Sequence, residues 1–145
     1  MKNKPVADFE KAGIDAKITV SRKIKKIDPV VENIANNLAE IDAIHFIRVS
    51  PGFLQASSET TEGRLKSPIT IPGHPTAIGV SLIIDFDYGD VQFFEMTSAI
   101  KGYGQKMVDA VLNALPQEWN GVVVMDWSDG FWDKMKDKHR NLVIL

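Results

Sequence analysis

The sequence predicts an α/β (α+β) fold in which a mixed, mostly antiparallel central sheet is flanked by helices. The antiparallel part is indicated by two apolar segments, 77–86 and 91–96, which are separated by turn-forming residues and predict a β-hairpin. The parallel part is indicated by 91–125, whose order of strand, helix and strand requires a crossover and favours parallel neighbours. A chain of 145 residues is expected to form a single domain, 1–145.

The N-terminal third is expected to contribute a helix and a strand. Residues 1–16 are expected to form a short arm or a first helix, and the basic stretch 17–27 a solvated strand or loop edge, with anion binding as the alternative. Asp28-Pro29 predicts a helix start, because Asp is a good N-cap and Pro suits the first helical position. This helix is expected to bury apolar residues at helical spacing, namely Val30, Ile34, Leu38 and Ile41. A strand is predicted at 45–49.

The middle of the chain, 51–79, is predicted to be a long loop rich in Pro, Gly, Ser and Thr, in which 52–56 or 69–71 could form short strands. Loops this long are uncommon in compact domains and are often functional or mobile. After the hairpin, a helix is predicted over 102–115, and Pro116 ends it.

The C-terminal part is predicted to add two strands and a helix. The continuous apolar run 122–125 predicts a strand buried on both faces. Asp126 or Ser128 is expected to cap a helix that continues through Met135, and 142–145 is predicted to be a terminal strand.

Composition and charge exclude several classes of function. The formal net charge of −2 gives no general attraction to nucleic acid or membrane, and the absence of Cys excludes disulfides, thiolate catalysis and cysteine-bound metals. The three histidines lack the spacing of a metal site. Because the N-terminus lacks the apolar core of a secretory signal and no apolar run is long enough to span a bilayer, a cytoplasmic protein is expected.

The most informative stretch is Lys101-Gly102-Tyr103-Gly104, which joins the strand at 91–96 to the helix at 102–115. Glycine allows positive φ and close approach of the backbone to a ligand. The first turn of a helix presents unpaired N–H groups and the positive end of the helix dipole. The order of strand, glycine turn and helix therefore predicts a phosphate-binding site, with a plain tight turn as the alternative.

A family resemblance extends this prediction. Residues 99–104, Ala-Ile-Lys-Gly-Tyr-Gly, resemble the acyl-CoA-binding signature Gln/Arg-x-x-Gly-x-Gly/Ala of the GCN5-related N-acetyltransferase (GNAT) superfamily, although Ala99 replaces the polar first residue. Residues 130–135 resemble the family's Phe-Tyr-Glu-Lys-Leu-Gly-Phe segment, with Trp132 where many members place a tyrosine that protonates the departing thiolate. The resemblance covers roughly 91–140 and implies an acyl-CoA N-acyltransferase-like fold.

The resemblance also implies the cofactor, which would be acetyl-CoA or another acyl-CoA. Backbone N–H groups of the glycine turn would bind its pyrophosphate. The residues expected to bind the cofactor are Met96, Lys101, Gly102, Tyr103, Gly104, Gln105, Lys106 and Trp132. Packing in the core is the alternative for Trp132. The basic cluster of the last helix would meet the ribose phosphate or form a solvated face; its members are Lys134, Lys136, Lys138, His139 and Arg140.

Two residues are candidates for catalysis. Glu95 is the expected general base, because a carboxylate flanked by Phe93, Phe94 and Met96 is suited to accept a proton; the alternative is a solvent-facing strand residue. Ser128 is a candidate hydroxyl donor, and a helix cap is the alternative.

Two functions are indicated, and a weaker alternative is a small structural or regulatory protein whose glycine turn binds nothing. The first is an acyl-CoA-dependent N-acyltransferase, in which the amine of a small molecule or a protein attacks the thioester directly and the acceptor enters beside the 51–79 loop. The second is a catalytically weak or inactive CoA-binding or partner-binding module on the same fold. The resemblance also allows a homodimer, and the sequence names neither the acceptor amine nor the acyl group.

Overall fold

The computed structural model describes residues 3–10, 16–126 and 128–145. Near the N-terminus, strand β1 (Lys4–Pro5) pairs antiparallel with β3 (Lys26–Ile27), and the short helix α1 (Val6–Glu10) follows β1 directly. The expected arm or first helix therefore contains a short helix, and residues 11–15 lie outside the described part of the chain.

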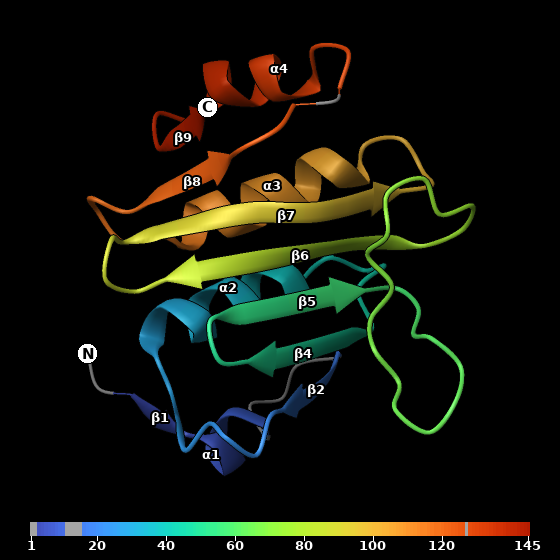
Figure 1. Cartoon of the computed structure of the whole chain (residues 1–145), viewed down its shortest axis with the longest axis vertical. Coiled ribbons are helices and arrows are strands. Elements are labelled where there is room, and N and C mark those ends of the chain that lie inside the picture. The colour runs from blue at the N-terminus through green and yellow to red at the C-terminus, as the bar shows by residue number, and fades with distance from the viewer. Residues whose placement is uncertain (1–2, 11–15, 127) are drawn as a thin grey trace.

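A seven-stranded sheet forms the centre of the fold, in the order β2-β4-β5-β6-β7-β8-β9 (Figure 1). Strands β4 to β7 are antiparallel, whereas the pairs β2–β4, β7–β8 and β8–β9 at the two sides are parallel. The strands are β2 (Lys17–Val20), β4 (Phe46–Ser50), β5 (Phe53–Ser57), β6 (Ile78–Asp85), β7 (Asp90–Ser98), β8 (Asn120–Val123) and β9 (Leu142–Ile144). The predicted mixed sheet, its hairpin and its parallel strand–helix–strand unit are confirmed.

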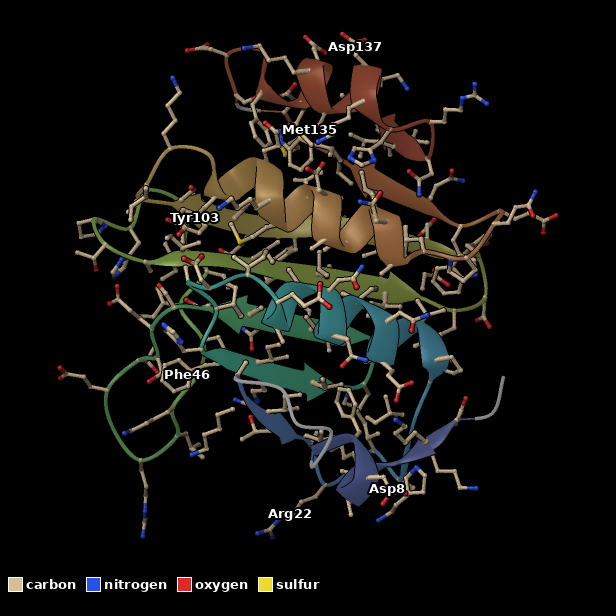
Figure 2. All side chains as sticks on the ribbon, turned by 180° about the vertical axis from the view of Figure 1, so that it is seen from behind. Asp8, Arg22, Phe46, Tyr103, Met135 and Asp137 are labelled. Carbon is tan, nitrogen blue, oxygen red and sulfur yellow. The ribbon has the colours of Figure 1, made fainter. Side chains whose placement is uncertain are left out.

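Helices α2 (Pro29–Ala39) and α3 (Tyr103–Ala114) lie side by side over one face of the sheet, which we call the helix face (Figure 2). The predicted start of α2 is confirmed, because Asp28 Oδ1 accepts a hydrogen bond from the Val30 amide at 2.8 Å. The core lies between this face and the two helices, and its fully buried members include Ile34, Leu38, Leu54, Val80, Leu82, Met107 and Val111. Helix α4 (Phe131–Lys138) follows β8.

The predicted strand at 122–125 is wrong in extent and in burial. Strand β8 ends at Val123, and the side chains of Val124 and Met125 are 44% and 63% exposed. The chain leaves the sheet here, because β8 pairs with β7 only as far as Val122. A continuous apolar run therefore marks both a buried strand and the exposed segment that leaves it.

The other differences concern the loop and the last helix. Two short strands were considered within 51–79. The one at 52–56 is confirmed as β5, which leaves a loop at 58–77. The segment 69–71 is not a strand, and the isolated bridge described in this loop joins Thr60 and Pro68. The N-cap residue of α4 is Gly130, at φ 90°, rather than Asp126 or Ser128. Ser128 Oγ nevertheless accepts a hydrogen bond from the Trp132 amide in the first turn of α4, at 3.4 Å. The predicted ends of α3 and the terminal strand are confirmed to within one or two residues.

Part of the 58–77 loop crosses the face of the sheet opposite the helices, at the end where β5 and β7 finish (Figure 1, green). We call residues 67–72 the strap and the sheet face beneath them the strap face. Arg48 Nη1 donates to Ser67 Oγ at 3.0 Å, and the Ile69 carbonyl lies directly over Gly79 of β6. Gly79 is required for this contact, because a Cβ there would collide with the Ile69 oxygen.

Replacing Gly79 with Ala is expected to lower the free energy of unfolding by about 1–3 kcal/mol, because the added methyl group overpacks a backbone contact that cannot rotate away. Urea denaturation monitored by circular dichroism measures this change. The matched control is Thr76→Ala at an exposed loop position, which is expected to change stability by no more than about 0.5 kcal/mol. Equal stabilities of the two variants would contradict close packing of the strap on β6.

Candidate functional site

The cavity that brings most of the predicted site residues together lies where β7 and β8 separate. The two strands pair only over Asp90–Gln92 of β7, yet β7 continues to Ser98. A cleft of about 670 Å³ opens beside the unpaired part of β7, and we call it the β7–β8 cleft. This volume is within the range of ordinary ligand sites, roughly 300–1,000 Å³.

A β-bulge shapes the wall that β7 contributes to this cleft. Leu82 of β6 pairs with Phe93, but the next pair is Ser81 with Glu95, so Phe94 is an extra residue. Opposed residues of paired strands share a face, so Phe93 belongs to the helix face with Leu82, and Glu95 belongs to the strap face with Ser81. Bulges of this kind re-aim side chains and are common beside active sites.

The open edge of β7 also presents a backbone donor. The Ala99 amide donates to Ala77 O on the β6 side. Backbone N–H groups alternate between the two sides of a strand, so the amide of Met96 points away from β6 and toward the cleft. Met96 was expected at the cofactor site, and it lines the cleft.

The glycine turn forms a second wall of the cleft, at the N-terminus of α3. Gly102 is the N-cap residue and has φ 97°, a left-handed conformation that favours glycine. The Lys106 amide donates to Gly102 O at 3.2 Å, whereas the amides of Gly104 and Gln105 have no acceptor among the described residues. Gly102, Gly104 and Gln105 all line the cleft, so the N-terminus of α3, with its unpaired N–H groups and the positive end of its dipole, lies at the cleft.

Gly104 also allows α4 to approach α3 closely. A Cβ at this position would lie 3.4 Å from the Phe131 ring and 3.7 Å from Met96 Cε. The glycine therefore keeps the first turn of α3 in contact with the first turn of α4 and with β7.

The expected cofactor lysines do not all face the cleft. Lys101 lines it, whereas the Lys106 side chain lies over the Tyr103 ring, with Nζ 4.7 Å from the ring centroid, and lines a separate groove between α2 and α3. Tyr103 is also directed toward α2, because its hydroxyl donates to Asp42 Oδ1 at 2.9 Å. That hydrogen bond, followed by burial and the negative charge of Asp42, raises the pKa of the Tyr103 phenol above its usual value, so the phenol stays protonated at neutral pH.

Most of the basic cluster of α4 is engaged elsewhere. Lys138 Nζ and His139 Nε2 each lie 2.7 Å from a carboxylate oxygen of Asp109 in α3. Lys136 Nζ donates to Leu142 O at 3.1 Å. Lys134 is the member of the cluster that lines the cleft, so it is the one placed to meet an anion there.

Glu95 lines the cleft from the strap face and is held by the strap. Thr70 is 3% exposed, and its Oγ1 donates to Glu95 Oε1 at 3.2 Å. Ser81, opposite Glu95 on β6, is fully buried, and its hydroxyl has no hydrogen-bond partner among the described residues. Neither Thr70 nor Ser81 was predicted from the sequence to lie at the site. Ser81 could have been noticed as the one hydroxyl in an apolar strand, whereas nothing local marks Thr70.

Ser128 lines the cleft, but its hydroxyl is already engaged. Oγ donates to Asp126 Oδ1 at 2.6 Å and accepts from the Trp132 amide at 3.4 Å. The hydroxyl proton therefore points to a carboxylate, and the oxygen supports the first turn of α4.

The Trp132 ring lines the cleft and is almost completely buried. Its side chain is 8% exposed, and its ring centroid lies 5.0 Å from that of Phe93 and 5.1 Å from that of Phe131. The ring joins the hydrophobic core and also lines the cleft, so it combines the two roles considered for it.

No family model, curated protein or solved structure matches this chain. Among residues 3–10, 16–126 and 128–145, no three His, Asp or Glu side chains group closely enough to hold a metal ion. No helix of the described chain has the length and hydropathy needed to cross a membrane.

Proposed function

We propose that this protein is an acyl-CoA-dependent N-acyltransferase of the GNAT type, which transfers an acetyl or other acyl group from CoA to an amine. One observation carries the proposal: a single cleft joins free amides at the N-terminus of α3 to the carboxylate of Glu95. Two strands that separate beside a glycine turn fit the fold implied by residues 99–104 and 130–135.

The residues of the cleft fit the phosphates of CoA. The amides of Gly104 and Gln105 would donate to the pyrophosphate, and the helix dipole would favour its negative charge. Lys101 and Lys134 line the same cleft and would supply two positive charges. The pantetheine arm would then lie along the unpaired edge of β7, between Met96 and Trp132.

Bound acyl-CoA supplies a thioester, and the residues of this chain act on it and on the amine. The Met96 amide would donate to the thioester carbonyl oxygen and stabilise the negative charge that develops when the amine attacks. Glu95 would take a proton from the amine nitrogen, directly or through water, as the C–N bond forms and the C–S bond breaks. The thiolate leaves without a protein acid, because a thiol is far more acidic than an amine.

A specific observation also favours a second function, a CoA-binding module without turnover. The Ser128 hydroxyl is bonded to Asp126, and Trp132 carries an N–H that donates but does not titrate. Neither side chain is therefore placed to protonate a departing thiolate. In this alternative the cleft would bind CoA, and a partner protein would use the complex.

Acetyl-CoA is expected to bind the purified protein in native mass spectrometry and to raise its melting temperature. At an acetyl-CoA concentration about 100-fold above Kd, binding stabilises the folded state by about 2.7 kcal/mol, which raises the melting temperature by roughly 5–10 °C for a chain of this size. Release of free thiol from acetyl-CoA in the presence of primary amines measures turnover. A shift with no thiol release from any amine would favour the binding module, and no shift would refute both functions.

A further inference from the structure

The β7–β8 cleft is lined by both charged and apolar side chains. Its basic side chains, Lys101 and Lys134, accompany the first turns of α3 and α4. Pro72 of the strap, Phe94 of β7 and Met125 after β8 line the same cleft as Glu95. Phe94 is 54% exposed and Met125 is 63% exposed. Large apolar side chains exposed together in a cleft indicate a ligand with an apolar surface.

The bulge in β7 places an aromatic ring next to the candidate base. Phe94 and Glu95 follow one another in sequence, yet both belong to the strap face. Glu95 opposes Ser81 there, and the Phe94 ring packs edge-to-face on Phe53, at 6.2 Å between centroids. Phe53 opposes Ile83 on the same face. In a regular strand, two successive residues would point to opposite faces, so the bulge creates the pairing of ring and carboxylate.

The Phe94 ring and the Glu95 carboxylate together suit a ligand that carries both an apolar group and an ammonium group. A carboxylate attracts an ammonium group and can accept its proton, while Phe94, Met125 and Pro72 offer apolar surface in the same cleft. Glu95 lies beside the Phe94 ring, the Thr70 hydroxyl and the Ser81 hydroxyl, none of which carries a charge. These side chains offer no cation to an acceptor with its own carboxylate or phosphate.

We infer that the acceptor is a small primary amine with an aromatic or branched aliphatic body, whose nitrogen lies at Glu95 and whose body lies on Phe94, Met125 and Pro72. The inference rests on the proposed function and specifies its substrate class. Hydrophilic amines such as ethanolamine and polyamines such as 1,4-diaminobutane would gain no binding free energy from contact with Phe94, Met125 and Pro72.

The test is thiol release from acetyl-CoA with phenethylamine, tryptamine, ethanolamine and 1,4-diaminobutane as acceptors. The two aromatic amines are expected to have kcat/KM values about tenfold or more above those of the other two. Burying an apolar surface the size of an aromatic side chain contributes enough binding free energy for a ratio of this size. Phe94→Ser is expected to lower kcat/KM for phenethylamine about tenfold more than it lowers kcat/KM for ethanolamine, mainly through KM. The matched control is Tyr88→Ser, an 84% exposed aromatic in the turn at the far end of β7, which is expected to change neither value.

The outcomes separate this inference from the proposed function. Equal kcat/KM values for aromatic and hydrophilic amines would overturn the inference and leave the acyltransferase standing. Absence of an acetyl-CoA shift in the unchanged protein would overturn both. If Phe94→Ser lowers the melting temperature, Phe94→Leu is measured in its place, because Leu keeps an apolar contact at this position. A fall in kcat/KM that is confined to the aromatic amines supports the inference. An equal fall in kcat/KM for all four amines overturns it.

Discussion

Replacing Glu95 with Gln is expected to lower the kcat of amine acylation by about 100-fold or more, the contribution typical of a positioned general base. Gln keeps the size of the side chain, and its carbonyl oxygen can still accept the hydrogen bond from Thr70. The amide cannot take the proton that the amine must lose. Initial rates of thiol release at saturating acetyl-CoA and amine measure the effect.

Binding of acetyl-CoA is expected to be unchanged in the Glu95→Gln protein, because Glu95 is proposed to act on the amine, whereas the glycine turn is proposed to hold the pyrophosphate. Glu62→Gln is the matched control: it makes the same chemical change at an exposed position in the 58–77 loop and is expected to leave kcat unaltered. A Glu95→Gln protein with the kcat of the parent would assign proton removal to water or to another group. The proposed acyltransferase function would then remain, but Glu95 would not be its general base.

Replacing Gly104 with Trp is expected to abolish the acetyl-CoA shift in melting temperature. The position is buried and lines the cleft, and a Cβ there already touches the Phe131 ring at 3.4 Å. An indole at this position is expected to fill the part of the cleft beside the amides of Gly104 and Gln105, where the pyrophosphate would bind. The shift is measured with and without acetyl-CoA, and far-ultraviolet circular dichroism checks that the variant is folded.

Two further variants make this result specific. Gly104→Ala adds one methyl group at an ordinary contact distance and is expected to fold and to weaken binding without abolishing it. Lys106→Ala removes a positive charge one turn into the same helix, but its Nζ lies over Tyr103 and outside the cleft, so the shift is expected to persist. A folded Gly104→Trp protein with an unchanged shift would place the ligand elsewhere on the molecule.

Features that depend on neighbouring residues were predictable from the sequence. The start of α2 follows from Asp28-Pro29, because capping and the fixed φ of Pro act within one turn. The hairpin of β6 and β7 follows from its turn residues, and the start of α3 follows from Gly102 directly before it. The two free amides of that turn follow as well, because every helix leaves its first N–H groups unpaired.

Features that depend on distant residues were not predictable. The sequence offers Lys101 and Lys106 as equivalent lysines, but Tyr103 and α2 hold Lys106 outside the cleft. The end of β8 at Val123 depends on where β7 diverges, and the bulge at Phe94 appears only in the register with β6. Thr70 reaches Glu95 from 25 residues away, through a segment, 69–71, for which the sequence allowed a short strand but gave no partner.

The sequence by itself determined the order of the elements from α2 to the C-terminus and the glycine turn before α3, because propensity, capping and turn chemistry act over a few residues. Only the tertiary structure decided which side chains share the cleft with that turn: Glu95 with its Thr70 partner, Phe94 on the bulge, and Lys101 rather than Lys106. The physical reason is that the direction of a side chain is set by strand register and by packing between elements, which join residues far apart in the chain.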